Sequence, residues 1–428
     1  MDTIFALASA AGKAGVSVIR ISGPSALLVA GQMGAVLLEH DRKLVRLIGR
    51  DGSLIDEAFA ISFGAGRSFT GEQVVEFQTH GSPAIVSSVL QELESIGLRG
   101  ADAGEFTRRA MENGVMDIAR VEGLADLIDA ETESQRRQAI RVFKGDLGEI
   151  TEKWRKKLIR ATALLEATID FVDEDVPIDV YPEVKQLVTE IASEVQKEAD
   201  GVGIRERVRD GFEIALIGPP NSGKSTLLNR LAGRDAAITS DIAGTTRDVI
   251  EVSMDLNGLP VTVLDTAGIR ESSDTLENIG IKRGLDRAQS ADVRVHLSAD
   301  GTFEKASFDT GLDLFIRSKA DISDVSGPDW ISAKTGLGIS NLLGKIQEYL
   351  ETQVASAGIA TRRRHEASLR ASDVALQRFM DGLASDILPV DLLSDELQQA
   401  IRALDSLIGR IDVENVLDEI FSSFCIGK

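Results

Sequence analysis

The segment "GPPNSGKST" constrains the fold more than any other part of this 428-residue chain. The apolar run "FEIALI" precedes it and predicts a buried strand, while "STLLNRLAG" follows and predicts a helix. Gly218, Gly223, Lys224 and Ser225 satisfy G-x-x-x-x-G-K-[ST], a pattern that surrounds phosphate oxygens with backbone N–H groups. The following helix would direct its positive N-terminal end at the same anion. We therefore expect Lys224 to contact the β- and γ-phosphates and Ser225 to bind Mg²⁺.

Four short motifs after this loop predict that the nucleotide is GTP. "GTTRD" offers the Thr246 hydroxyl to Mg²⁺, and "DTAG" places Asp265 near the metal and Gly268 near the γ-phosphate. "SKAD" supplies Asp321, whose carboxylate can accept two hydrogen bonds from guanine, and "SAK" can pack against the base. An ATPase is the main alternative, and Asp321 argues against it. The residues expected to contact nucleotide are Asn221, Ser222, Gly223, Lys224, Ser225, Thr226, Thr246, Asp265, Thr266, Ala267, Gly268, Ser318, Lys319, Ala320, Asp321, Ser332, Ala333 and Lys334.

Two positions depart from the pattern of small GTPases. Ile269 follows "DTAG", where a Ras-like protein has the glutamine that orients water, so hydrolysis needs another group. Ser318 stands where the guanine motif N-K-x-D has asparagine, and it lacks the amide that bridges to the phosphate loop. We expect guanine recognition through Asp321 with weaker affinity.

The period of the apolar residues divides the chain into four segments. Residues 1–117 mix short β-rich runs with turns and predict an α+β domain. Residues 118–207 and 357–428 carry apolar stripes at helical spacing, so we expect one all-α domain whose two halves pack together. Residues 208–356 alternate strands and helices, which predicts an inserted Ras-like domain with a mainly parallel sheet. The expected fold class is therefore multidomain α/β.

Composition excludes several other classes of protein. The formal charge of −21 opposes broad, nonspecific nucleic-acid binding. Cys425 is the only cysteine, which excludes an intramolecular disulfide framework and suits a reducing, cytoplasmic location. The N-terminus lacks the basic region of a secretory signal, and the smoothest apolar run is too short to span a membrane. The final "CIGK" is also a poor prenylation signal, because glycine and lysine follow the isoleucine.

Segments along the whole chain resemble the MnmE (TrmE) family of bacterial tRNA-modification GTPases. The resemblance rests on "DTIFALASAAGKAGVSVIRISGP", "SFTGEQVVEFQTHG", "GEFTRRAMENGVMD", the GTPase motifs and the final "CIGK". It implies a homodimer that acts with the FAD-containing partner MnmG, in a heterotetramer, on carbon five of the wobble uridine of tRNA. The implied products carry aminomethyl or carboxymethylaminomethyl groups. The implied one-carbon donor is a tetrahydrofolate, in its 5-formyl or 5,10-methylene form, bound by the N-terminal domain.

The resemblance also implies roles for particular residues. The folate contacts map to Arg20, Glu76 and Lys428, although a buried Arg–Glu ion pair is the plainer interpretation of the first two. A lysine of the family's folate site is replaced by Val115 in "NGVMD". The Cys425 thiol would act near the one-carbon unit, and only its thiolate is strongly nucleophilic.

A K⁺ site and a water-orienting carboxylate are implied in the GTPase domain. Glu277 would orient the attacking water, and its alternative interpretation is an exposed helix carboxylate. The K⁺ would neutralise charge where other GTPases use an arginine. The residues assigned to the K⁺ loop are Asn221, Ser240, Asp241, Ile242, Ala243, Gly244 and Thr245. Four of them, Asn221, Ser240, Ile242 and Thr245, are the expected K⁺ ligands.

A regulatory GTPase switch without tRNA-modifying chemistry is the alternative to a tRNA-modifying enzyme. A pure switch has no need for Arg20, Glu76 and a C-terminal Cys-x-Gly-Lys.

Overall fold

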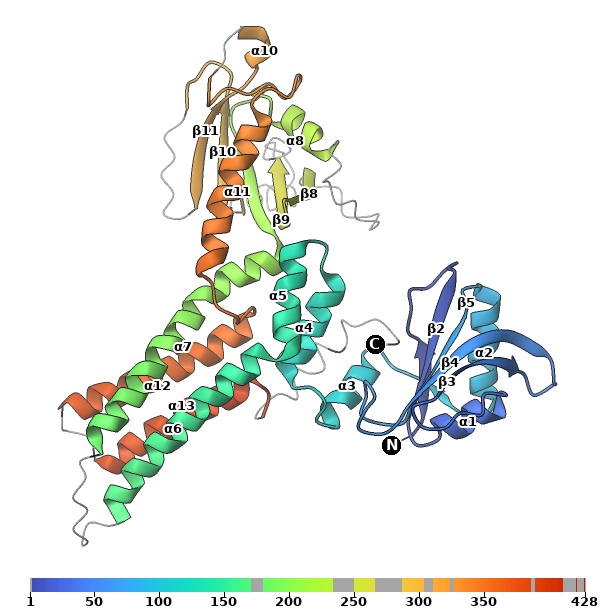
Figure 1. Ribbon diagram of the computed structural model, residues 1–428. Helices are drawn as coiled ribbons and strands as arrows, with labels where there is room; N and C mark the ends of the chain where they lie inside the picture. Colours follow the sequence, from blue (N-terminus) through green and yellow to red (C-terminus); the bar gives the residue numbers. More distant parts are fainter. Residues whose placement is uncertain are drawn as a thin grey trace, which may run out of the picture. The chain divides into compact units, whose positions relative to one another are not determined.

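The computed structural model describes most of the chain (Figure 1), which forms two compact units. The N-terminal unit comprises residues 1–125 and 408–428, and the helical–GTPase unit comprises residues 126–407. Each unit is described by itself below. The described residues are 2–170, 180–233, 250–265, 287–303, 311–323, 327–385, 389–410, 421 and 427.

The N-terminal unit is built on a six-stranded sheet with the strand order β3-β4-β5-β2-β1-β6. All described pairings are antiparallel except that of β1 with β6. The strands are β1 (Ile4–Leu7), β2 (Val16–Ser22), β3 (Arg42–Ile48), β4 (Leu54–Phe63), β5 (Val74–His80) and β6 (Arg99–Gly100). The helices that begin in this unit are α1 (Ala26–Gln32), α2 (Pro83–Ser95), α3 (Glu105–Glu112) and α4 (Ile118–Asp129).

Strand alternation gives this sheet two different faces. Ile19 and Ile21 of β2 pack with Phe77 of β5 in the core that α1 and α2 cover. Arg20 lies between Ile19 and Ile21, and Glu76 directly precedes Phe77, so both side chains point to the opposite face of the sheet. The α+β prediction for this region is confirmed.

The helical part of the second unit is formed by segments from both sides of the GTPase domain. Helix α12 packs on α7 and α13, and α6 packs on α13 and α7, so the predicted association of the two halves is confirmed. Most of the predicted stripe on α6 is buried, and the Trp154 indole donates a 2.6 Å hydrogen bond to Glu194 of α7. The helices are α5 (Glu133–Lys144), α6 (Asp146–Asp170), α7 (Tyr181–Asp210), α12 (Arg363–Ser385) and α13 (Val390–Leu407).

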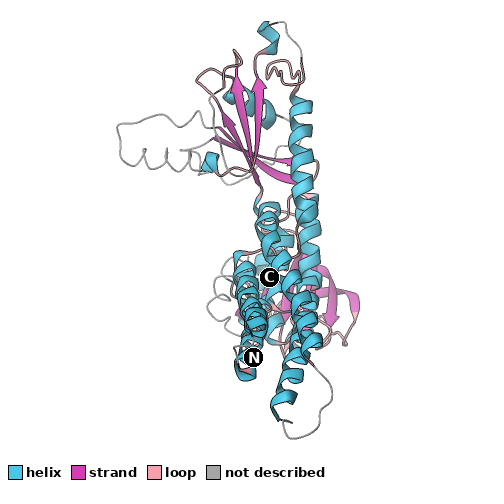
Figure 2. Cartoon of the chain, turned by 90° about the vertical axis from the view of Figure 1, so that its left-hand side faces the viewer, coloured by secondary structure: helices cyan, strands magenta, loops and turns pink. Residues whose placement is uncertain are grey.

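The GTPase domain contains a five-stranded sheet with the order β11-β10-β7-β9-β8, whose strands are magenta in Figure 2. Its strands are β7 (Phe212–Ile217), β8 (Ile250–Leu256), β9 (Leu259–Asp265), β10 (Val293–Ser298) and β11 (Leu312–Arg317). Only β8 runs antiparallel to its neighbour, which confirms a mainly parallel sheet. The helices are α8 (Lys224–Ala232), α10 (Ala320–Ser323) and α11 (Ile339–Ser356). Within the described ranges, no helix has the length and apolarity needed to cross a membrane.

Candidate functional site

The phosphate loop connects the end of β7 to the start of α8, at the carboxyl edge of the parallel strands. Gly218 has φ = 153°, and a Cβ there would lie 2.2 Å from the carbonyl oxygen of Leu297 on β10. Asn221 and Gly223 also have positive φ, at 64° and 100°. This backbone curls into a cradle that only glycine can form at its first position. Ligands of open α/β sheets bind at this edge.

Lys224 lies over the loop in the way the motif predicts. Its side chain is 5% exposed, and Nζ donates to the carbonyl oxygens of Gly218 at 2.6 Å and Pro219 at 3.0 Å. Burial lowers the pKa of Lys224, and attraction to Asp265 opposes that shift. In the described part of the chain the hydrogen bonds of Lys224 go to carbonyl oxygens, and a buried cation of this kind is well placed to bind an anion, so the residue fits the phosphate role.

Ser225 and Asp265 meet next to this cradle. Ser225 Oγ donates a 2.7 Å hydrogen bond to Asp265 Oδ2, and the parallel register of β7 and β9 places Asp265 beside Leu216. Hydroxyl and carboxylate oxygens are the ligands that Mg²⁺ prefers. The buried Ser222 Oγ has no hydrogen-bond partner among the described residues, which leaves a polar group available inside the loop. These residues therefore fit a magnesium nucleotide.

The guanine-side motifs are brought together after β11. The Ser332 hydroxyl donates to Asp321 Oδ1 at 2.6 Å and accepts from the Thr335 backbone N–H at 3.1 Å. The hydrogen bond from Ser332 lowers the pKa of Asp321. The Ala320 N–H also donates to the Ile331 carbonyl, which joins the two motif loops. Asp321 is thus an exposed, ionised acceptor held in place by the second motif.

Ser318 corrects part of the sequence interpretation. Its buried hydroxyl donates a 2.6 Å hydrogen bond to the Ser222 carbonyl of the phosphate loop. The bridge that an asparagine amide would make to this loop is therefore made by a hydroxyl. Weaker guanine affinity stays a prediction, because Ser318 still lacks the second polar group of an amide.

Several predicted site residues lie outside the described residues. The structure brings together the phosphate loop, Asp265 and the guanine motifs. The roles expected for the 240–245 loop, Glu277 and Cys425 stay predictions. The residues outside the described part are Ser240, Asp241, Ile242, Ala243, Gly244, Thr245, Thr246, Thr266, Ala267, Gly268, Ile269, Glu277, Cys425 and Lys428.

Arg20 and Glu76 form an ion pair on the face of the N-terminal sheet opposite the core covered by α1 and α2. They are direct partners in the antiparallel β2–β5 register, with Arg20 Nε 2.8 Å from Glu76 Oε1. The Arg20 Cζ lies 5.0 Å from the ring centroid of Phe69 and 5.6 Å from that of Phe106. The ion pair is present but only partly buried, since its side chains are 19% and 16% exposed, and the folate contact stays a prediction.

A buried ionic network centred on Arg109 was missed by the sequence analysis. Arg109 pairs with Asp2 at 2.8 Å, Glu72 at 3.2 Å and Glu105 at 2.9 Å. Burial would raise the pKa of Glu105, but hydrogen bonds from Arg99 and Arg109 hold it at about 2. The i, i+4 spacing of Glu105 and Arg109 in "GEFTRRA" was the one signal in the sequence.

The two described residues of the C-terminal tail contact the N-terminal unit. The Phe421 ring lies 5.0 Å from Arg108 Cζ, and a Cβ on Gly104 would lie 2.9 Å from the Phe421 carbonyl oxygen. Gly427 has φ = 100°, and a Cβ there would lie 2.0 Å from the Leu7 carbonyl oxygen. Both contacts fall within the N-terminal unit. Neither Phe421 nor Gly427 was assigned a role from the sequence.

A phosphate loop on a mainly parallel sheet, with an aspartate presented for guanine, defines a GTP-binding P-loop protein. Comparison with known proteins narrows this class. A model of the MnmE helical domain matches residues 118–425, and a model of the GTP-binding protein TrmE N-terminus matches residues 3–115. The chain therefore belongs to the MnmE family of tRNA modification GTPases, and it is a GTP hydrolase with a role in tRNA modification.

Individual relatives agree with this assignment over the full length. The tRNA modification GTPase MnmE of Roseobacter denitrificans is 56% identical, with 100% of both chains covered. The proteins of the same name from Cereibacter sphaeroides and Dinoroseobacter shibae are 54% and 53% identical, again over 100% of both chains.

Proposed function

We propose that this chain couples K⁺- and Mg²⁺-dependent GTP hydrolysis to folate-dependent modification of carbon five of the tRNA wobble uridine. In this proposal it acts in the cytoplasm as a homodimer, together with FAD-containing MnmG. The products carry aminomethyl or carboxymethylaminomethyl groups. The observation that carries the proposal is that one chain combines a formed GTP site with a tail that docks on its N-terminal unit at Gly427.

At the GTP site, the chain's residues bind and orient the nucleotide. Lys224, already above the phosphate cradle, would exchange its two carbonyl partners for phosphate oxygens. Ser225 and Asp265 would hold Mg²⁺ directly or through its water. Asp321 would accept hydrogen bonds from guanine, with Ser332 fixing one carboxylate oxygen.

Hydrolysis needs two further functions in this proposal. K⁺, bound by Asn221 and the 240–245 loop, would neutralise charge that develops on the phosphates. Glu277 would orient the attacking water in place of the glutamine that Ile269 replaces. Asn221 supports the first role, because it is exposed at the rim of the cradle with φ = 64°.

In the N-terminal unit, the residues around Arg20 fit a flat, polar ring system. Arg20 and Glu76 offer a donor and an acceptor side by side, the half-buried Phe69 ring provides aromatic surface 5.0 Å from the guanidinium carbon, and the buried Phe106 supports the guanidinium from the core. Lys428 would pair with a folate carboxylate. A bound tetrahydrofolate would supply the one-carbon unit, and Cys425 would bring a thiol close to it.

Reconstitution tests the proposal. The full-length chain, MnmG, tRNA, GTP, K⁺ and 5,10-methylene-tetrahydrofolate are combined with FAD, reduced nicotinamide, and ammonium or glycine as the nitrogen source, and tRNA nucleosides are analysed by mass spectrometry. We expect the modified wobble uridine to form, and to fall at least tenfold with Arg20→Gln or with Na⁺ in place of K⁺. Full modification by Arg20→Gln would refute the folate site while leaving the GTPase assignment intact.

A further inference from the structure

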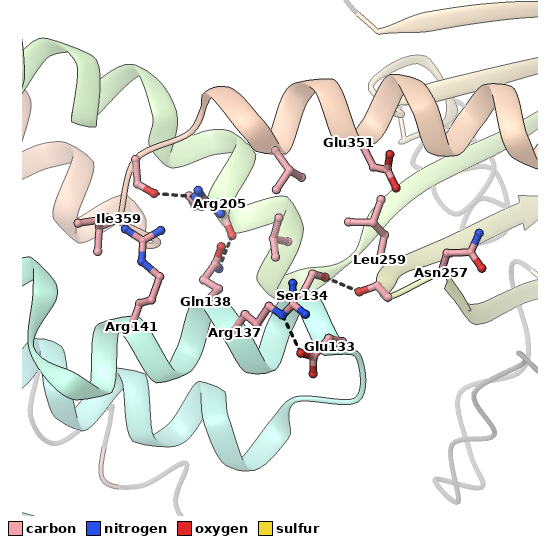
Figure 3. A pocket seen from close by; sticks show the side chains of 14 residues that line it. Glu133, Ser134, Arg137, Gln138, Arg141, Arg205, Asn257, Leu259, Glu351 and Ile359 are labelled. Carbon is pink, nitrogen blue, oxygen red and sulfur yellow. Dashed lines mark hydrogen bonds and ion pairs between the residues drawn. The ribbon is translucent and has the colours of Figure 1, made fainter.

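A cavity of about 440 Å³ lies between the helical domain and the lower edge of the GTPase sheet, within one compact unit (Figure 3). Its walls come from α5, α7, the β8–β9 turn and the end of α11. β7 begins near it at Phe212 and ends at the phosphate loop, and Leu259 opens the neighbouring strand β9. The cavity is therefore at the opposite edge of the sheet from the GTP site.

Three guanidinium groups line the helical side of this cavity. Arg137 and Arg141 are one helical turn apart on α5, so they share a face, and Arg205 faces them from α7. Figure 3 shows Arg141 and Arg205 extending toward each other. Because Glu133 and Glu351 also line the cavity, its lining carries a formal charge of +1 in a chain whose formal net charge is −21.

Carboxylates near the cavity compensate its arginines only in part: Arg141 pairs with Asp146 at 3.3 Å, and Glu198 attracts Arg205. Among the described residues the hydrogen bonds of Arg205 go to the carbonyl oxygens of Ala357 and Gly358, both at 2.7 Å, and it has no ion pair there. Glu133 is shared by Arg136 and Arg137, and Glu351 accepts from Gln347. Burial lowers the pKa of Arg205, repulsion from Arg141 adds to that effect, and attraction to Glu198 opposes it. An anion between the two guanidinium groups would relieve this repulsion.

The rest of the wall is mixed, because Glu133, Ser134, Gln138, Asn257 and Glu351 line it together with apolar side chains. Val208, Leu259, Val354 and Ile359 line the cavity beside the arginines. Pockets for small organic ligands combine an apolar wall with a few polar groups that fix orientation, and their usual volumes begin at about 300 Å³. Arginine pairs best with the oxygens of phosphate because its planar donors match them.

We propose that this cavity binds a small organic phosphate, with the phosphate between Arg141 and Arg205 and an apolar or ring body against Val208 and Ile359. The ligand would touch both connections between the GTPase and helical domains. Val208 precedes the entry into β7, and Ile359 follows the exit from α11. The site is thus an effector site that bridges the two domains and is separate from the GTP site.

Calorimetric titration of the full-length protein tests this site. The GTP site is first saturated with GDP and Mg²⁺, and the probe is 1-naphthyl phosphate. We expect saturable binding with one ligand per chain. Inorganic phosphate and neutral 1-naphthol should each bind at least tenfold more weakly. The first lacks the ring that packs on the apolar wall, and the second lacks the phosphate that pairs with the arginines. No saturable binding, or equal binding of 1-naphthol, overturns the proposal.

Matched variants on α5 locate the binding. Arg141→Gln should weaken 1-naphthyl phosphate at least tenfold, about 1.4 kcal/mol. Arg136→Gln removes the same charge from a neighbouring position that does not line the cavity, and it should bind normally. An equal loss of affinity in both variants would show that binding depends only on the overall positive charge, and it would overturn the site. If Arg141→Gln does not fold, Val354→Trp, which fills the cavity and keeps every arginine, must abolish binding, and retained binding refutes the site.

Discussion

The hydroxyl of Ser318 donates a 2.6 Å hydrogen bond to the main-chain carbonyl of Ser222, and so ties the guanine motif to the phosphate loop. Ser318 is buried at the end of β11, and its own N–H donates to the Ser298 carbonyl on β10. The guanine motif and the phosphate loop are thus connected without the asparagine of the common motif.

Ser318→Ala should weaken guanine nucleotide binding. The change leaves the Ser222 carbonyl without its partner, and an unsatisfied buried acceptor costs about 1–3 kcal/mol. That cost corresponds to a loss of about fivefold to a hundredfold, which we expect as faster release of a fluorescent GDP analogue in stopped flow. Ser253→Ala, at an exposed hydroxyl on β8, serves as the control. Unchanged release from Ser318→Ala would show that the bridge has no role in binding. Ser318→Asn should slow release if the amide adds contacts.

Gly427→Ala should abolish tRNA modification and leave GTP hydrolysis nearly unchanged. A methyl group there would lie 2.0 Å from the Leu7 carbonyl oxygen, so the tail must leave its position. Gly97→Ala is the matched control, because Gly97 has the same φ of 100° and open space around its missing Cβ. The measurements are tRNA nucleoside analysis and phosphate release. Normal modification by Gly427→Ala would show that docking of the tail is dispensable.

The Arg109 network should make stability sensitive to acid. The pKa of Glu105 is held at about 2, below its ordinary value of 4.5, so ionised Glu105 stabilises the folded state above pH 4.5. This contribution is lost as the pH falls from about 5 toward 2. Thermal melts of Glu105→Gln should show a lower Tm than the unmodified chain at pH 7 and a difference that shrinks at pH 3. A constant difference over that range contradicts the linkage.

K⁺ should stimulate GTP hydrolysis strongly over Na⁺ at matched ionic strength. The reason is the combination of Asn221 in the loop with Ile269 in place of a glutamine. Glu277→Ala should remove most of the K⁺-stimulated kcat and change nucleotide affinity little, because a water-orienting group acts mainly in the transition state. Equal rates of GTP hydrolysis in the two salts would contradict the K⁺ site. A normal kcat for Glu277→Ala would show that another group orients the water.

Local patterns made much of the GTPase domain predictable. The loop from Gly218 to Ser225 is contiguous, its glycines specify the backbone, and the flanking apolar runs specify a strand and a helix. The Arg109 network was not predictable, because its contacts with Asp2 and Glu72 span 107 and 37 residues and depend on the sheet register. The cavity near Arg205 could not be predicted for a similar reason, since its walls come from four separate segments of the chain. The Ser318 bridge depends on a single buried rotamer, which a motif comparison does not reveal.

Transfer of a labelled one-carbon unit tests the central claim most directly. The full-length chain, MnmG, tRNA, GTP, K⁺, FAD, reduced nicotinamide and ammonium or glycine are incubated with tetrahydrofolate whose methylene carbon is ¹³C, and the wobble nucleoside is analysed by mass spectrometry. We predict a heavier modified uridine that appears only when GTP and K⁺ are present and that is lost with Arg20→Gln. Modification with unlabelled carbon, or GTP hydrolysis with no labelled uridine under these conditions, would contradict that claim.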